Sequence, residues 1–167
     1  VHPGDVTECS FSPIPGTKMS RYDCNPVFSG TGEDWAPNLI SVGYNAQMVM
    51  GHPFYQIWYS AANPETESAY SLGHAILSNG TTWQTQPSNP LFEEPVKGGW
   101  DKDQMSTIKP IWDPKRRRYY LMYQGINYPK STVKLGLLES ADGISWQQSA
   151  HSPLLDQIGS ASGRERG

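Results

Sequence analysis

The sequence predicts an all-β protein, a partial β-propeller made of four-stranded antiparallel blades with a period of about 64 residues. Three observations carry this prediction. The composition favours strands and turns, with 16 Gly, 14 Pro, 9 Tyr and 6 Trp, and only 17% of the residues are charged. The chain repeats itself at a fixed spacing, and each copy holds four short strand patterns, which is the make-up of a propeller blade.

The repeat is clearest in a short proline-containing motif. Asn25-Pro26-Val27-Phe28 returns as Asn89-Pro90-Leu91-Phe92, and more loosely as Ser152-Pro153-Leu154-Leu155. Proline is tolerated where a strand begins, so the motif suits a connection between blades. Four further pairs keep nearly the same step: Trp35 and Trp100, Tyr59 and Tyr123, Gly73 and Gly136, Trp83 and Trp146.

These landmarks divide the chain into an N-terminal segment, two blades and the start of a third. We expect the boundaries 1–24 for the segment, 25–88 for blade one, 89–151 for blade two, and 152–167 for the beginning of a third blade and a polar tail. All four parts are expected to form one domain.

Each blade is expected to contain four strands in order. In blade one the strand patterns are 38–42, 54–60, 71–77 and 82–85, with an extra loop from about Gly43 to Pro53 before the second strand. In blade two they are 107–112, 118–124, 133–140 and 144–148. Turns are predicted at Asp113-Pro114-Lys115, at Ala141-Asp142-Gly143 and at Ser78-Asn79-Gly80.

Buried aromatic residues are expected where blades meet. Trp83 and Trp146 stand at the fourth strands of their units and are predicted to pack between neighbouring blades. His74 falls inside a third strand and is predicted to be a core residue rather than a ligand.

Charge and hydropathy exclude several classes of partner. The net charge is −3, and the one basic run, Lys115 to Arg118, lies in a predicted turn, which argues against nucleic acid. No apolar stretch is long enough for a membrane helix, so no membrane partner is expected. The protein is expected to be soluble, with a secreted or periplasmic location favoured, and Cys9 and Cys24 form either one disulfide or two free thiols.

The pattern of motifs resembles a known group of enzymes. The chain carries Asn-Pro-Val, then a Trp, a Pro-led strand, the Tyr-rich strands YQIWYSA and YYLMYQG, and a closing Asp-Gly-Ile-Ser-Trp. This pattern, over about 25–156, resembles the five-bladed propeller glycosidases, which include arabinanases, β-xylosidases, fructosidases and related phosphorylases. The resemblance implies a carbohydrate partner, and two and a half blades out of five imply a truncated chain or a homo-oligomer that covers the open blade edges.

In the resembled enzymes a pair of carboxylates faces a central funnel. The resemblance makes Asp34, Asp101 and Asp103 the catalytic candidates, because all lie just before predicted innermost strands. Two positions depart from the family pattern. Asn38 replaces an aspartate in Trp-Ala-Pro-Asp, and Lys109 replaces the acid of an Arg-Asp-Pro stretch.

The remaining candidates would bind substrate rather than react with it. Asn38 can still bond a sugar hydroxyl, and Lys109 suits an anionic or polyhydroxylated ligand or is simply solvated. Trp35 and Trp100 are either sugar platforms or blade core. No cofactor or metal is expected, because phosphate-loop and metal-ligand motifs are absent and His2, His52, His74 and His151 are scattered.

Two functions therefore stand side by side. One is a glycosidase-like propeller fragment that binds or hydrolyses carbohydrate. The other is a non-catalytic carbohydrate-binding or assembly module that kept the blade scaffold without the catalytic acids.

Overall fold

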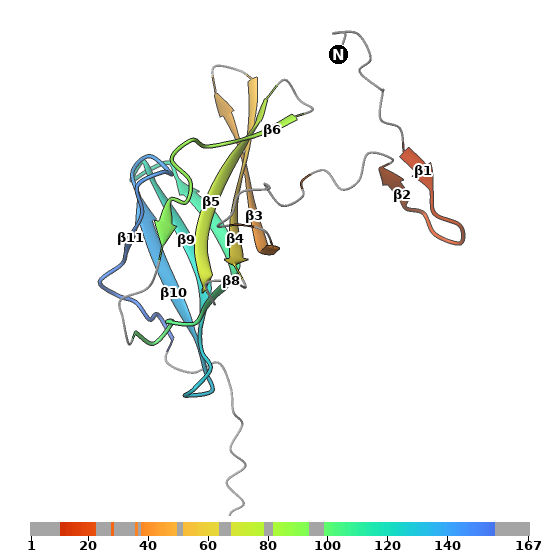
Figure 1. Ribbon diagram of the computed structural model, residues 1–167. Coiled ribbons are helices and arrows are strands. Elements are labelled where there is room, and N and C mark those ends of the chain that lie inside the picture. Colours follow the sequence, from red (N-terminus) through yellow and green to blue (C-terminus); the bar gives the residue numbers. More distant parts are fainter. Residues whose placement is uncertain are drawn as a thin grey trace, which may run out of the picture.

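Two antiparallel sheets of four main strands each carry the fold, as the computed structural model shows (Figure 1). The structure describes residues 11–22, 28, 36, 38–49, 52–63, 68–78, 82–93 and 99–155. Every regular element in these ranges is a strand, so none of them is an apolar helix of membrane-crossing length. The chain is a partial β-propeller, as predicted.

The first sheet is formed by β3 (Asn38–Val49), β4 (His52–Asn63), β5 (Ser68–Ser78) and β6 (Thr82–Thr85), in that order. The second sheet is formed by β8 (Gln104–Asp113), β9 (Arg118–Asn127), β10 (Thr132–Ser140) and β11 (Gln147–Gln148). A short strand β7 (Phe92–Glu93) adds to the edge of β5. One parallel pair, Ala69 with Gln104, joins the two sheets.

The predicted loop from Gly43 to Pro53 is wrong. β3 continues to Val49 and pairs with β4 as far as the Val49–His52 pair, so the segment forms a long hairpin. The tip of this hairpin carries Met48, Val49 and Pro53 with few turn residues, and its backbone groups pair with each other across the two strands.

The predicted strand 144–148 is also too long. Only Gln147–Gln148 is a strand, because the preceding residues fold around Asp142. Its Oδ1 accepts hydrogen bonds from the backbone N–H groups of Ile144 and Ser145, at 2.8 and 2.7 Å. Gly143 completes this turn with a φ of 79°, which favours glycine.

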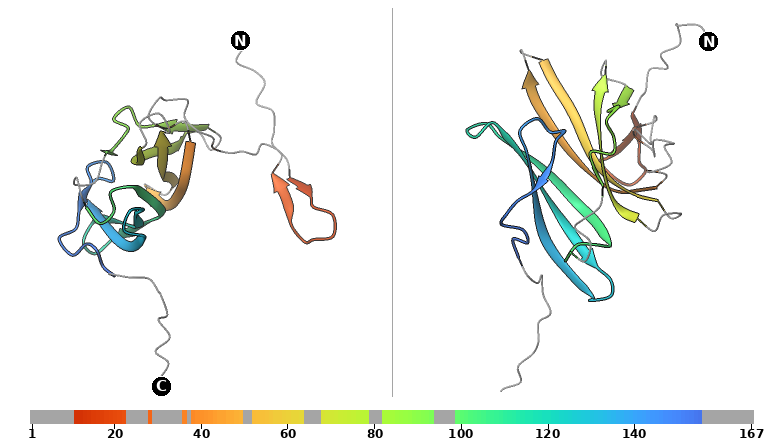
Figure 2. Two further views of the ribbon diagram at one scale, coloured as in Figure 1. Left: turned by 60° about the horizontal axis from the view of Figure 1, so that its bottom comes forward. Right: turned by 60° about the vertical axis from the view of Figure 1, so that its left-hand side comes forward.

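The two sheets pack face to face over one aromatic core (Figure 2). Trp58 of the first sheet meets Trp146 of the second edge-on, with ring centroids 5.9 Å apart. Both indole N–H groups donate to the carbonyl oxygen of Gly143, at 2.9 and 3.0 Å. Trp146 is therefore buried between blades as predicted, whereas Trp83 packs half-buried in a second cluster on the outer face of the first sheet, with Phe28 and Tyr59.

The same contacts recur in both units at a separation of 63 or 64 residues. Tyr59 lies over Gly73 and Tyr123 lies over Gly136, and in each case an added Cβ would stand 2.3 Å from the tyrosine ring. This close approach requires glycine, since no neighbour can yield by so much. The domain boundaries themselves stay a prediction.

The proline motifs anchor these units through the residue before the proline. Asn89 accepts a hydrogen bond from the backbone N–H of His74 and donates to its carbonyl, both at 3.0 Å. Ser152 does the same for Leu137, at 2.9 and 3.0 Å. Both X-Pro bonds are cis. Asn25, Pro26 and Val27 of the first motif, Asn79 and Gly80 of the predicted turn, both cysteines and the tail 156–167 lie outside the described residues.

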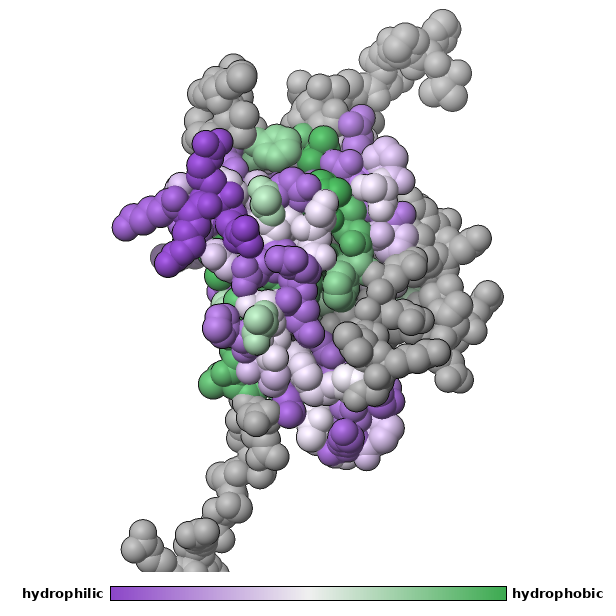
Figure 3. All heavy atoms as spheres, turned by 90° about the vertical axis from the view of Figure 1, so that its left-hand side faces the viewer, coloured by the Kyte–Doolittle hydropathy of each residue, from purple (hydrophilic) through white to green (hydrophobic). Residues whose placement is uncertain are grey.

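The N-terminal segment contributes a separate hairpin. β1 (Phe11–Pro13) and β2 (Ser20–Tyr22) pair with each other and lie apart from both sheets (Figures 1 and 2). On the side of the molecule where β10 and β11 lie, hydrophilic side chains predominate, with smaller apolar areas between them (Figure 3).

Candidate functional site

An open groove runs along the line where the innermost strands β3 and β8 meet. Its volume is about 490 Å³. The lining comes from neighbouring positions of both strands and from the adjoining face of the second sheet: Val42, Gly43, Tyr44, Thr107, Ile108, Lys109, Pro110, Met122, Gln124 and Leu135. The groove thus combines apolar side chains with hydroxyl, amide and ammonium groups.

Close contact between the two strands holds the groove floor in place. The hydroxyl oxygen of Ser41 accepts a hydrogen bond from the backbone N–H of Ile108, at 3.1 Å. A Cβ at Gly43 would stand 2.4 Å from Cδ of Pro110 and 2.8 Å from the carbonyl oxygen of Ile108. Glycine at this position therefore lets β3 and β8 approach each other.

A β-bulge interrupts β8 inside the groove. The register with β9 shifts between Ser106 and Lys109, and Thr107 within the bulge has a φ of 50°. A β-branched residue in this left-handed region is an outlier. Its hydroxyl donates to Oε1 of Gln124 at 3.2 Å, which ties the bulge to β9. Bulges often occur beside functional sites, where they redirect a side chain.

Lys109 gives the groove its charge. It is exposed, and it is the only charged side chain among the described residues that line the groove. Within the described part of the chain its ammonium group has no carboxylate partner. The groove can therefore donate hydrogen bonds and offer a positive charge, but none of the described lining residues supplies a proton-transferring carboxylate.

The predicted catalytic acids do not meet in this groove. Asp34, like Trp35, lies outside the described residues. Asp101 is only 2% exposed, and its Oδ2 accepts hydrogen bonds from the Tyr123 hydroxyl at 2.6 Å and from Nε2 of Gln148 at 3.1 Å. The carboxylate is buried on the face of the second sheet that packs on the core, and it holds the buried Tyr123 side chain in place.

Asp103 lies just before β8, and both of its carboxylate oxygens have partners. Its Oδ1 pairs with Lys102 at 2.6 Å, and its Oδ2 accepts from the backbone N–H of Tyr128 at 2.7 Å. The hydrogen bond from Lys102 lowers the pKa of Asp103 below its usual range. The arrangement ties β8 to the turn after β9.

The other predicted binding residues are also spread out. The Trp100 ring stacks on Tyr123 with centroids 5.8 Å apart and packs against the core between the sheets. Asn38 is exposed at the start of β3, opposite Ala62. Of the predicted site residues that the structure describes, Lys109 alone lines the groove.

Two features of the groove have no simple signal in the sequence. The bulge at Thr107 arises in a segment that reads as a continuous strand, and only the structure shows its positive φ. Tyr44 was expected in a loop and instead extends from β3 at 63% exposure.

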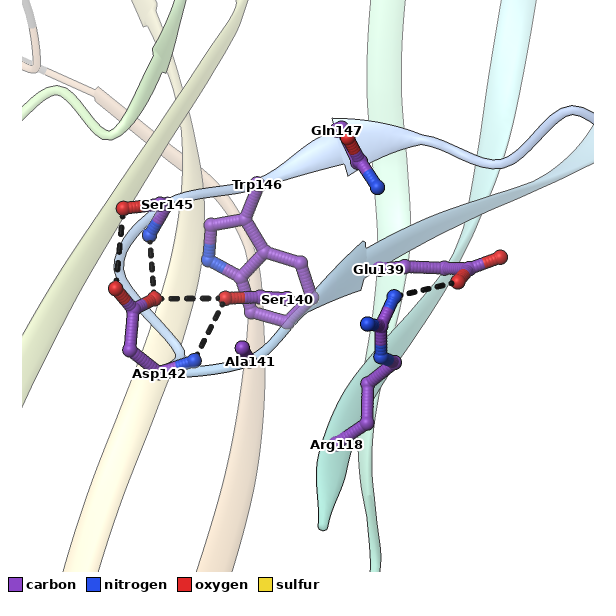
Figure 4. Close-up of a pocket in the computed structure, with 8 residues that line it drawn as sticks. All are labelled: Arg118, Glu139, Ser140, Ala141, Asp142, Ser145, Trp146 and Gln147. Carbon is purple, nitrogen blue, oxygen red and sulfur yellow. Dashed lines mark hydrogen bonds and ion pairs between the residues drawn. The ribbon is translucent and has the colours of Figure 1, made fainter. Parts of the chain in front are cut away.

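A second pocket of about 260 Å³ lies at the rim of the second sheet, beside the Asp142 turn (Figure 4). Arg118 pairs with Glu139 there at 3.2 Å. Backbone hydrogen bonds from Ser145 and Ile144 lower the pKa of Asp142 to about 2. The pKa of Glu139 is also lowered, first by a hydrogen bond from Ser149 and then by Arg118. Both carboxylates are ionised at neutral pH, so neither suits a general acid, which needs a raised pKa.

His74 is a core residue, as predicted. It is 3% exposed and its Nε2 lies 3.0 Å from Oε1 of Gln56. Burial lowers its pKa to about 4, so the ring is neutral in the folded protein. Over the described residues, no group of three or more histidine, cysteine or acidic side chains is arranged to hold a metal ion.

Comparison by sequence finds no matching family model and no matching curated protein. Comparison by structure finds propeller glycoside hydrolases. A putative glycoside hydrolase from Parabacteroides distasonis matches with a TM-score of 0.59 and 15% identity, over 83% of this chain and 41% of the other. A family 117 glycoside hydrolase from Zobellia galactanivorans matches with a TM-score of 0.53 and 19% identity, over 68% and 33%.

A third neighbour belongs to the GH130 family, described as mannoside phosphorylases that also contain hydrolases of β-1,2-mannosidic linkages. It matches with a TM-score of 0.59 and 16% identity, over 87% of this chain and 42% of the other. The chain spans about two fifths or less of these neighbours' length. It has the blade architecture of the propeller glycoside hydrolases, over two of their blades.

Proposed function

We propose that this chain is a carbohydrate-binding part of a glycosidase-like propeller, with the saccharide held in the groove between β3 and β8. The observation that carries the proposal is the composition of the groove, in which the Thr107 hydroxyl, the Gln124 amide and Lys109 stand beside Tyr44 and Met122. Polar groups placed among apolar side chains are typical of ligand sites.

The geometry supports this assignment in two further ways. Tyr44 exposes 63% of its surface, and an aromatic face packs well against the apolar face of a sugar ring. The groove is partly open to solvent, so a saccharide can enter it, and the fold is shared with enzymes that act on glycosides.

Affinity electrophoresis through gels that contain plant, algal or fungal polysaccharides tests the proposal. At least one polysaccharide is expected to retard the chain, and Tyr44→Ala should weaken that retardation. Tyr55→Ala is the matched control, because Tyr55 is also partly exposed at 36% but does not line the groove. Unretarded migration in every gel would rule out the binding proposal.

Hydrolysis is a second candidate, supported by the activities that the structural neighbours' names carry. It requires two carboxylates about 5 Å apart, or ~6.5–9.5 Å apart, across the bound sugar. Asp34 remains the candidate for one of them, with Asp101 or Asp103 for the other, although both described acids are engaged elsewhere. Release of nitrophenol from a panel of nitrophenyl glycosides, abolished by Asp34→Asn, would establish it.

A further inference from the structure

We propose that the groove selects saccharides that carry a negative charge, either the carboxylate of a uronic acid or a sulfate ester. This inference rests on the proposed function, since it assumes that the β3–β8 groove holds a saccharide. Lys109 supplies the charge that recognises the anion, and Gln124 and Thr107 supply the groups around it.

The first argument is the position of Lys109 in the repeated scaffold. Lys109 pairs with Met122 across β8 and β9. The residue of the first unit that corresponds to Met122 is Trp58, 64 positions earlier, and Trp58 pairs with Gly43 across β3 and β4. The first unit thus packs with a glycine where the second unit carries a long cation, so packing between strands does not account for the lysine.

The second argument is the strained backbone that leads into Lys109. The bulge places Thr107 at a φ of 50°, which is unfavourable for a β-branched residue. The strain is held by the hydrogen bond from Thr107 to Gln124 and by the bond from the Ile108 N–H to Ser41. Both residues that precede Lys109 are fixed, so the lysine enters the groove from a rigid base.

The third argument is the balance of donors and acceptors. The side-chain carbonyl oxygen of Gln124 accepts the hydrogen bond from Thr107, and the NH₂ group of Gln124 has no partner among the described residues. That leaves the ammonium of Lys109 and the amide NH₂ of Gln124 as donors on one side of the groove, with no described carboxylate in the lining to compete. Two donors, one of them cationic, match the oxygens of a carboxylate or a sulfate group.

The experiment measures dissociation constants for four probes by isothermal titration calorimetry. They are a galacturonate oligosaccharide, its methyl ester, a sulfated galactan oligosaccharide and the same galactan without sulfate. The charged member of at least one pair is expected to bind about tenfold more tightly than its neutral partner, as one charged hydrogen bond provides. The advantage should shrink as salt is raised, because salt screens exposed charges.

Variants assign this preference to Lys109. Lys109→Met should remove the advantage of the charged probe over the neutral one, whereas Lys109→Arg should keep that advantage. Lys115→Met is the matched control, because Lys115 is exposed at the β8–β9 turn, outside the groove. The uronate and sulfate pairs show which anion is recognised.

The outcomes separate this inference from the proposed function. Equal binding of charged and neutral probes, unchanged in Lys109→Met, would overturn charge selection and leave carbohydrate binding intact. A charge preference that survives Lys109→Met would overturn the role of the lysine. Binding of none of the four probes, together with free migration in the polysaccharide gels, would overturn both.

Discussion

Asn89 offers the sharpest test of how the first unit is held together. Its side chain makes three hydrogen bonds, to the N–H of His74, to the carbonyl of His74 and to the Tyr59 hydroxyl at 3.1 Å. In Asn89→Ala the His74 carbonyl keeps a partner, because it also accepts from the Gln86 N–H at 3.0 Å. The His74 N–H loses its partner, and the Tyr59 hydroxyl loses the hydrogen bond that it accepts from Asn89.

The expected cost follows from these losses. A backbone donor left unpaired costs about 1–3 kcal/mol, and the lost tyrosine bond adds about 0.5–1.5 kcal/mol. Asn89→Ala should therefore lower the free energy of unfolding by roughly 2–4 kcal/mol. Asn89→Ser should lose much less, about 0.5–1.5 kcal/mol, because Ser152 already satisfies both backbone groups of Leu137 with one hydroxyl.

Equilibrium urea unfolding, followed by tryptophan fluorescence, measures the free energy of unfolding of both variants, which are compared with the same m-value. Ser88→Ala is the control, since Ser88 is exposed next to Asn89 and should change stability by less than about 0.5 kcal/mol. If Asn89→Ser is as unstable as Asn89→Ala, the equivalence of Asn89 and Ser152 is wrong.

Three further predictions follow from other contacts. The pKa of His74 falls from 6.5 to about 4 on folding, so the unfolded chain binds the proton first. Stability should therefore fall by about 3 kcal/mol as the pH drops from 6.5 to 4, and His74→Leu should flatten that part of a pH series of urea melts. Gly143→Ala should cost at least about 1–2 kcal/mol in the same melts because φ is 79° and the new Cβ would lie 3.1 Å from Trp58. Gly16→Ala, with a φ of 77° but nothing within 4 Å, should leave the main transition in place, and equal effects of the two changes would refute the packing argument. We also propose that a second copy covers the face of the second sheet that exposes Ile111 and Val133, because its Met122 and Leu135 correspond to Trp58 and Leu72, which are buried between the sheets. Met122 and Leu135 also line the groove, so this assembly should compete with saccharide binding. Light scattering after gel filtration should then give a mass above the 18.6 kDa of one chain. A single species of 18.6 kDa would refute the assembly.

The fold was predictable because its signals are local and repeated. Three kinds of local motif can be read directly from the sequence, and each reflects a conformation that the backbone must adopt. They are the glycine packed under a tyrosine, the proline after Asn89 or Ser152, and the Asp142-Gly143 turn. Seven of the eight predicted strands were recovered for this reason, and the eighth was recovered only at Gln147–Gln148. The long β3–β4 hairpin was missed because its tip carries no Asn-Gly or Asp-Gly pair, and cross-strand pairing rather than a turn motif defines it.

The candidate site was predictable only at Lys109. Proximity to an innermost strand suggested Asp101, Asp103 and Trp100 equally well, but sequence position does not say to which side of the backbone a side chain points. Asp101 turns toward Tyr123, and Asp103 turns toward Lys102. In a segment that precedes a strand, alternation cannot be applied, so these directions come from the three-dimensional contacts alone.

The repeat also indicates where function should be sought. Residues that recur between the units, such as Tyr59 and Tyr123 or Asn89 and Ser152, satisfy packing and backbone hydrogen bonds that every blade shares. A position that serves one unit only is free of that shared requirement. Lys109, which stands where the first unit has a glycine, is such a position, and it lies in the groove where the innermost strands meet. Chemistry specific to this protein is therefore expected where the two units differ, whereas their common residues explain why the blades form.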